Sequence, residues 1–530
     1  MRTVISLLLM LVVTAAASAA VFQYNVPLES EKGSHSAFLW IPPEAKQVRG
    51  VILAGSTLME RPFSKDPIIR KAAAEEQLAI VFSTKGLGGL DIQKLLDKLA
   101  EESGYKEVSV APLMFVGHSA GGPPSHDLAR KYADRSFGLV QYRGGGPSKD
   151  FPVNVPALMM VGQFDEFGGR MDRPDGTEQW DGGRKHMAGY RKENPQAAAT
   201  VIVEPGAGHF AWSERNAKYL AMWIQKAAEA RIPEKWNIDA DKPVNLKEID
   251  YDNGYLTSLA LEKKDPTEAA GVDEYKGDKS YTNWHFDKEM AEATERYHDG
   301  LARKKHQFIK WKDAHWVDAG ARFFFLGMKW VDDGTVFEVH PVYRDDIPGQ
   351  YKGRGPKWIK AGQKVGHSDA PIKVKPVSGP IVAIGDNRFR LQHDSLNPAG
   401  ARSRATFIAY SEGDEEYRYT EQVGMMPRGW RGLKKGKSQT ITFPELKDIP
   451  ADSKPVDLEA TSDARLPVRY YVAYGPAVVE NGKLKVTQVP RRAECPIEVK
   501  VVAYQFGSGL KGKQIKTAEP VERTLKITKP

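Results

Sequence analysis

Hydrophobic and polar positions alternate in two different ways along the chain. Between about residue 36 and residue 230, short runs that are apolar on both faces alternate with stretches of helical periodicity. Strands are predicted for SAFLWIP, GVILAG, LAIVFS, PLMFVG, FGLVQY, ALMMVG and ATVIVEP, and helices for KDPIIRKAAAEEQ, LDIQKLLDKLAEESG, GPPSHDLARKYAD and NAKYLAMWIQKAAEA. Doubly apolar strands separated by helices predict an α/β fold with a mainly parallel sheet that is covered on both faces.

After residue 235 the pattern changes. Residues 236–282 are polar and rich in Asp, Lys and Gly, which predicts a linker. Residues 283–449 begin with helical spacing and continue as alternating runs such as TVFEVHPVY and RATFIAYS, so we expect a helix plus a β-rich domain. Residues 450–530 are expected to form a third unit. Because a linker would separate two kinds of periodicity, we expect a chain that ends near residue 275 to be self-sufficient.

Length and composition agree with this division. A chain of 530 residues is too long for one hydrophobic core and is expected to form roughly three domains. The net charge of +8 comes from 76 basic and 68 acidic residues that are interspersed, which is typical of a soluble surface. No nucleic-acid-binding motif surrounds the basic clusters, so we expect no nucleic-acid partner.

The first twenty residues, MRTVISLLLMLVVTAAASAA, predict a secretory signal peptide at positions 1–20. The alternative is a membrane anchor, but the apolar run is shorter than the ~20 residues that a spanning helix needs. We therefore expect the mature protein, from residue 21, to be secreted, periplasmic or attached to the cell surface. The single cysteine, Cys495, cannot form an internal disulfide and is expected to pack passively.

One short motif suggests chemistry. Gly117, Ser119 and Gly121 form a G-x-S-x-G pattern directly after the predicted strand PLMFVG and before a predicted helix. In one interpretation Ser119 only caps that helix. In the other, the pattern is a nucleophile elbow, where small flanking residues allow a turn sharp enough to expose the serine oxygen. The strand before the motif and the helix after it are the context that an elbow requires.

Two further residues follow strand ends and could assist Ser119. Asp165 comes after the strand ALMMVG, and His209 comes after the strand ATVIVEP. An unassisted serine hydroxyl is a poor nucleophile, so it needs a base and a third group that orients the base. We expect His209 to be the base and Asp165 the orienting acid. Other candidates for the acid are Glu166, Asp172 and Asp150.

Residues 36–230 resemble the secreted α/β-hydrolases of the esterase and lipase superfamily. The run GVILAGSTL resembles a segment of depolymerase-type and feruloyl-type esterases in which a strand is followed by His-Gly and an oxyanion residue. Ala54 stands where that histidine would be, and Gly55 and Ser56 fit the rest. The resemblance implies an α/β-hydrolase fold and a serine carboxylester hydrolase without cofactor or metal. Its expected substrates are small or polysaccharide-linked acyl esters.

The oxyanion of such a reaction needs backbone donors. We expect them to be the N–H of Ala120 and one from Ser56 or Thr57. The C-terminal run LEATSDARLPVRYYVAYGPAVVENGKLKV resembles bacterial immunoglobulin-like modules. The resemblance implies an immunoglobulin-like β-sandwich at residues 450–530, which would serve as a spacer or a docking piece for a cell surface or glycan.

The connection between Asp165 and His209 is long and contains several aromatic or bulky side chains. It is either an ordinary surface loop that leads into a helix, or a segment that overhangs the pocket. In the second interpretation it forms an aromatic wall with two residues that follow His209. The residues concerned are Trp180, His186, Met187, Tyr190, Phe210 and Trp212.

Two other functions fit parts of the pattern. A serine peptidase of prolyl-oligopeptidase type would share the triad, but no blade repeat of a propeller occurs here. A surface or glycan-binding protein with a relic hydrolase domain would have no need of Ser119, Asp165 and His209 together. The histidines at 285, 298, 306 and 315 lack metal-binding spacing and are expected to be solvated.

Overall fold

The computed structural model describes residues 21–29, 35–55, 57–163, 178–204, 206–237, 242–260, 267–298, 304–312, 324–326, 330–332, 334–346, 363–401, 404–426 and 432–529, with the backbone alone at 178–181, 324–325 and 330. The predicted signal peptide lies outside these ranges. None of the helices within them is long and apolar enough to cross a membrane.

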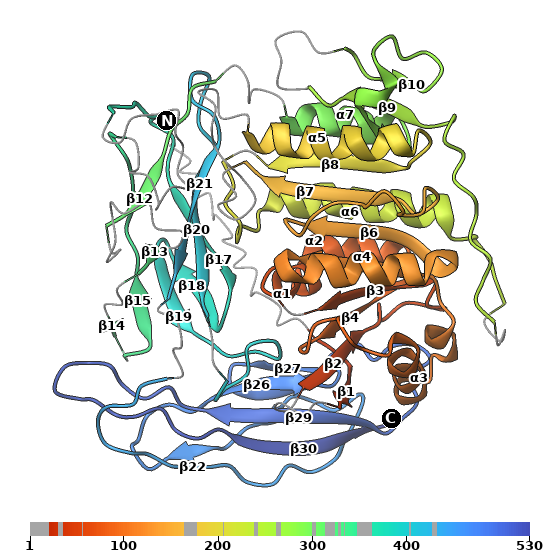
Figure 1. Ribbon diagram of the computed structural model, residues 1–530. Coiled ribbons are helices and arrows are strands. Elements are labelled where there is room, and N and C mark those ends of the chain that lie inside the picture. The colour runs from red at the N-terminus through yellow and green to blue at the C-terminus, as the bar shows by residue number, and fades with distance from the viewer. Residues whose placement is uncertain are drawn as a thin grey trace, which may run out of the picture.

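An eight-stranded sheet forms the centre of the N-terminal part, in the order β1-β2-β4-β3-β5-β6-β7-β8 (Figure 1). The strand β2 pairs antiparallel with β1 on one side and with β4 on the other. From β4 to β8 the neighbouring strands of the sheet pair parallel. This confirms the predicted α/β-hydrolase sheet. Its strands are β1 (Tyr24–Leu28), β2 (His35–Trp40), β3 (Gly50–Gly55), β4 (Leu78–Ser83), β5 (Leu113–His118), β6 (Ser136–Tyr142), β7 (Ala157–Gly162) and β8 (Ala199–Glu204).

Helices cover both faces of this sheet, as its doubly apolar strands require. Along β3, Ile52 and Ala54 pack with α1, α2 and α6, whereas Val51 and Leu53 pack with α3, α4 and α5 on the opposite face. The helices are α1 (Glu60–Lys65), α2 (Pro67–Glu75), α3 (Ile92–Ser103), α4 (Gly122–Lys131), α5 (Glu178–Glu193) and α6 (Glu214–Arg231).

The stretch predicted as a linker is packed against the edge of the sheet. It contains β9 (Tyr255–Ser258) and β10 (Ala270–Gly271), which join β11 (Thr282–His285) and precede α7 (Lys288–His298). The N–H of Val201 in β8 donates to Asn283 Oδ1, 2.8 Å away. Leu256 and Tyr275 of this stretch share a small core with Ala198 and Trp284. The polar composition that predicts a linker thus conceals widely spaced apolar residues that meet only after folding.

Two further sheets follow and pack face to face. The first contains β13 (Phe324–Phe325), β21 (Thr420–Met425), β20 (Thr406–Ser411) and β17 (Lys373–Ser378). The second contains β14 (Trp330–Val331), β15 (Val336–Glu338), β19 (Arg388–Leu391) and β18 (Ile381–Gly385). Beside them β12 (Ile309–Trp311) pairs with β16 (Pro341–Tyr343).

The strand β20 shows how this β-rich part meets the hydrolase sheet. Phe407 and Ala409 face the second sheet, whereas Ile408 and Tyr410 belong to the same hydrophobic cluster as the helices α2 and α6. Figure 1 shows the sheet of β17, β20 and β21 beside the ends at which β6, β7 and β8 finish. Since sites in parallel sheets form at the carboxyl ends of the strands, the β-rich part borders the candidate site.

The C-terminal part is a pair of sheets around its own core. One sheet is β23 (Ile449–Pro450), β30 (Val521–Thr528), β29 (Ile497–Tyr504) and β26 (Arg469–Tyr474), and the other is β24 (Val456–Asp457), β28 (Lys483–Val486) and β27 (Ala477–Glu480). A short pair, β22 (Ile441–Thr442) and β25 (Thr461–Ser462), lies beside them. Ile497 packs with the hydrolase core and Tyr504 with the preceding β-rich core.

Candidate functional site

Ser119 lies in a sharp turn between β5 and α4. Its φ is +53°, a left-handed conformation that side-chain-bearing residues seldom adopt. A side chain at Gly117 would collide with the backbone of Gly121, and a Cβ at Gly121 would lie 2.7 Å from Glu60 Oε1. The glycines of the motif are therefore needed for this close approach. A strained strand-turn-helix with an accessible serine has the geometry of a nucleophile elbow.

His209 meets Ser119 at this turn. It lies in the loop after β8, is 3% exposed, and its Nε2 is 2.8 Å from Ser119 Oγ. The two residues are 90 positions apart in the chain, and the folding of β5 beside β6, β7 and β8 brings them together. At this distance the imidazole can accept the hydroxyl proton.

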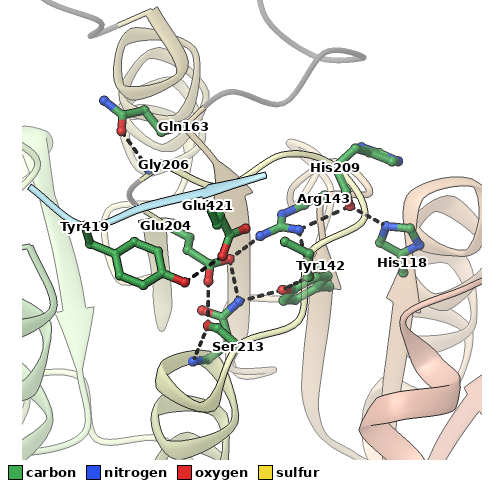
Figure 2. A network of polar contacts seen from close by, with 12 residues as sticks. His118, Tyr142, Arg143, Gln163, Glu204, Gly206, His209, Ser213, Tyr419 and Glu421 are labelled. Carbon is green, nitrogen blue, oxygen red and sulfur yellow. Dashed lines mark hydrogen bonds and ion pairs between the residues drawn. The ribbon is translucent and has the colours of Figure 1, made fainter. Parts of the chain in front are cut away.

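The backbone carbonyl of His209 is held by two buried side chains (Figure 2). His118 Nε2 lies 3.0 Å from this oxygen, and Arg143 donates to it from 3.2 Å. Because a carbonyl oxygen only accepts, His118 Nε2 carries the hydrogen in this contact. Arg143 also donates to the carbonyl of Ala211, 2.9 Å away. The loop that carries the imidazole is thus fixed from two directions.

The other nitrogen of His118 leads to a buried carboxylate. His118 Nδ1 lies 2.9 Å from Thr57 Oγ1, which lies 2.8 Å from Glu60 Oε2. The backbone N–H groups of His118 and Thr57 also donate to Glu60, at 2.8 and 3.1 Å. Burial raises the pKa of Glu60 from 4.5 to about 7, and these hydrogen bonds limit the rise. A titratable acid therefore stands directly behind the elbow.

Arg143 takes its position from a second buried carboxylate. It forms an ion pair with Glu204 at the end of β8, and both side chains are 1% exposed. Ser213 Oγ donates to Glu204 Oε1 from 2.6 Å, and Asn216 Nδ2 donates to Glu204 Oε2 from 2.5 Å. These bonds join the end of β8, the start of α6 and the His209 loop into one network.

The β-rich part adds a third carboxyl group to this network. Glu421 of β21 is buried beside Glu204 and accepts a hydrogen bond from the Tyr419 hydroxyl, 2.8 Å away (Figure 2). Burial and the nearby charge of Glu204 raise the pKa of Glu421 well above its usual range. The neutral acid is thus the favoured form, so the interface between the two parts of the chain avoids a clash of two carboxylates.

The predicted acid of the triad falls on residues that are not described. Asp165, Glu166 and Asp172 all lie outside the described ranges. Asp150 is described and is exposed: it accepts a hydrogen bond from Ser148 Oγ at 2.6 Å and forms an ion pair with Arg130. These partners explain the lowered pKa of Asp150 and place it in a surface cluster. Asp165 therefore stays the predicted acid.

The predicted oxyanion donors are only partly described. Ala120 is exposed in the turn directly after Ser119, whereas Ser56 lies outside the described residues. The N–H of Thr57, the alternative donor, is directed at Gly55 O and Glu60 Oε2, both 3.1 Å away. Thr57 is therefore engaged within the protein and does not suit the role.

The predicted aromatic wall is divided between core and site. Met187 and Tyr190 of α5 are buried in the hydrophobic core, and Trp212 packs its ring edge-on against Phe63. Phe210 adjoins the site, with its ring 4.7 Å from that of His209. His186 bonds the carbonyl of Pro147, 3.0 Å away, and the Trp180 side chain lies outside the described residues.

The prediction of solvated histidines is wrong at two positions, because His285 and His298 are buried and burial lowers the pKa of each to about 3. His285 lies on a strand, and His298 ends α7. Among the described residues, no three His, Cys, Asp or Glu side chains are placed to hold a metal ion.

The sequence did not reveal how Thr57 and Glu60 are arranged behind the elbow. Thr57 and Glu60 have the spacing of a capping box, and the Glu60 carboxylate does accept from the Thr57 N–H, so that signal was available. Arg143 follows β6, and Glu204 ends β8. The two residues are 61 positions apart, so their ion pair leaves no local pattern in the sequence.

No protein-family model matches the sequence, and no curated protein matches it. Similar solved structures include an S-formylglutathione hydrolase from Agrobacterium tumefaciens, 14% identical over 40% of this chain and 96% of that chain, with a TM-score of 0.28. Est1E from Butyrivibrio proteoclasticus is 12% identical over 39% of this chain and 99% of that chain, with a TM-score of 0.27. A thermophilic esterase from Thermogutta terrifontis is 15% identical over 39% of this chain and 99% of that chain, with a TM-score of 0.26. The fold assignment does not rest on these similarities. It rests on the strand order of the sheet and on the turn at Ser119.

Proposed function

We propose that this protein is a serine carboxylester hydrolase that acts through an acyl-enzyme. The observation that carries the proposal is the 2.8 Å contact between Ser119 Oγ and His209 Nε2 at a left-handed elbow. An N-capping serine needs neither a histidine partner nor a strained φ, so the helix-cap interpretation leaves both features unexplained.

In the proposed reaction, His209 Nε2 takes the proton from Ser119 as Oγ attacks the carbonyl carbon of the ester. The negative charge moves to the carbonyl oxygen, where the N–H of Ala120 stabilises it. Collapse of this intermediate breaks the bond to the alcohol oxygen, which receives the proton from His209. Water then attacks the acyl-enzyme by the same steps, releasing the acid and restoring Ser119. Asp165 is proposed to orient His209.

The location and the substrate class are part of the same proposal. The segment at residues 1–20 supports export, to the periplasm, the cell surface or the medium. Small or polysaccharide-linked acyl esters, the substrates that the resemblance of residues 36–230 implies, are the substrates we propose. No step of this reaction requires a cofactor.

A panel of acetyl, feruloyl, glucuronoyl and longer acyl esters, assayed with the mature chain, tests the proposal. Ser119→Ala and His209→Ala proteins are the controls, and aminoacyl-proline amides test the peptidase alternative. We expect turnover of at least one ester class that both substitutions abolish, and no amide cleavage. Amide cleavage at a higher kcat/KM than any ester would favour the peptidase, and no turnover of any compound would favour a non-catalytic protein.

A further inference from the structure

A cleft of about 230 Å³ lies where the start of α6 meets the sheet of β17 and β20. Its walls come from two parts of the chain: Arg215 and Lys218 from α6, and Lys373, Lys375 and Tyr410 from the two strands. Ligand sites are common at such junctions between domains. The cleft therefore exists only in the assembled protein.

The cleft carries an excess of positive charge. Four cationic side chains, Arg215, Lys218, Lys373 and Lys375, line it together with the carboxylates Glu214 and Glu412. The N-terminus of α6, which is the positive end of its helix dipole, also lies at the cleft. Glu214 lies 2.7 Å from Lys218 and 3.6 Å from Lys375, but these groups are at least 42% exposed. Exposed ion pairs add little stability, so stability does not account for this concentration of charge.

Aromatic rings hold two of the cations in place. The guanidinium of Arg215 lies 4.8 Å from the Tyr297 ring and 5.4 Å from the Tyr419 ring, and it donates to the Tyr297 carbonyl from 2.7 Å. Lys375 Nζ lies 5.2 Å from the Tyr410 ring. Such contacts restrict the side chains before any ligand arrives, which lowers the entropic cost of binding.

The mixture of groups indicates the class of ligand. Cations bind a carboxylate, whereas Glu214 and Glu412 can only accept hydrogen bonds and would repel a simple anion. Sugar hydroxyls donate hydrogen bonds, so a sugar supplies the donors that the carboxylates of Glu214 and Glu412 can accept. A sugar that bears a carboxylate satisfies all of these groups, and a neutral sugar or an inorganic anion satisfies only some.

The cleft is linked to the site at Ser119. Ser213 lines the cleft and donates to Glu204, which pairs with Arg143, which in turn holds the carbonyl of His209 (Figure 2). We propose that this cleft binds a carboxylate-bearing sugar of an acidic polysaccharide and so presents esters on that polysaccharide to Ser119. The presentation of esters rests on the proposed function; the binding itself does not.

Isothermal titration of the full-length Ser119→Ala protein with a uronate tetrasaccharide tests the binding without turnover. The methyl-esterified tetrasaccharide is the uncharged probe, and inorganic sulfate at equal ionic strength is the simple anion. We expect binding of the uronate alone, weakened by salt. Equal binding of the esterified probe, full displacement by sulfate, or no binding of the uronate would each overturn the proposal.

A pair of matched variants locates the binding. Lys373→Gln with Lys375→Gln changes two lysines that are two positions apart on β17, and Lys483→Gln with Lys485→Gln changes two with the same spacing on β28. We expect at least about a tenfold loss of affinity in the first variant and none in the second. Equal affinities in the two variants would contradict the assignment.

The same variants with Ser119 intact separate this proposal from the proposed function. We expect the Lys373 and Lys375 variant to hydrolyse phenyl acetate as the unaltered chain does, because neither lysine is part of the site at Ser119. Uronate binding without any ester hydrolysis would contradict the proposed function but not the binding site. Ester hydrolysis without uronate binding would contradict the binding site but not the proposed function.

Discussion

Arg143 and His209 are joined by a hydrogen bond from the guanidinium to the backbone carbonyl, 3.2 Å long. The imidazole of His209 therefore depends for its position on a buried ion pair, Arg143 with Glu204, that touches neither Ser119 nor any substrate in the proposed reaction. Arg143 is a positioning residue in this account.

Arg143→Met should lower both stability and turnover. Removing one partner of a buried ion pair leaves the charge of Glu204 uncompensated, which costs about 3–5 kcal/mol of unfolding free energy. Displacement of His209 should lower kcat by about 10²-fold with little change in KM, since a small misplacement has that effect. Urea unfolding and ester kinetics, the latter at a temperature where the variant is folded, measure the two effects.

The double variant Arg143→Met with Glu204→Gln is the control for stability. It removes the stranded charge, so we expect it to recover part of the lost unfolding free energy while kcat stays low. Recovery of kcat together with stability would show that Arg143 acts only on folding.

The pH dependence of stability should report Glu60. Its pKa is about 7 in the folded protein and 4.5 in the unfolded chain, so between these values the folded state binds the proton more tightly. The unfolding free energy therefore falls as the pH rises from 4.5 to about 7, by at most about 3 kcal/mol from this residue.

Glu60→Gln removes this contribution, and denaturant unfolding at pH 5 and pH 7.5 measures it. We expect the variant to lose less stability than the unaltered chain over that interval. Glu421, whose pKa is also raised, contributes to both proteins and cancels in the difference. Identical losses in the two proteins would show that Glu60 does not titrate in this range.

The acid of the triad can be assigned by two substitutions. We expect Asp165→Asn to leave the fold intact and to lower kcat by about 10⁴-fold, because an amide stabilises the wrong tautomer of His209. Asp150→Asn should be nearly silent, because the Asp150 carboxylate is exposed and occupied by Ser148 and Arg130. A silent Asp165→Asn beside an inactive Asp150→Asn would reverse the assignment.

A chain that ends near residue 275 should not be self-sufficient, contrary to the expectation from periodicity. The cut removes β11 and α7, whose Met290 and Tyr297 are buried with the hydrolase core, and also Ile408 and Tyr410 of β20. We expect this chain to aggregate or to lack ester hydrolysis in size-exclusion and activity assays, with the full chain as reference. A monodisperse product with full activity would show that these contacts are dispensable.

The alternation of strands and helices up to residue 230 made the hydrolase sheet predictable. The proximity of Ser119 and His209 was also predictable, because each follows a strand whose carboxyl end the topology directs to one edge. Arg143 and Glu60 were not, because their roles arise from contacts between distant segments. The packing of residues 242–260 and 267–282 was missed for a related reason: Leu256 and Tyr275 are too widely spaced in a polar context to form a periodic signal.

The central claim is that Ser119 is the nucleophile, and active-site labelling tests it most directly. The mature protein is treated with a fluorophosphonate, digested, and mapped by mass spectrometry. We predict a single phosphonylated residue, Ser119, with labelling abolished in Ser119→Ala and slowed strongly in His209→Ala. Labelling at another residue, or labelling that survives Ser119→Ala unchanged, would contradict the account.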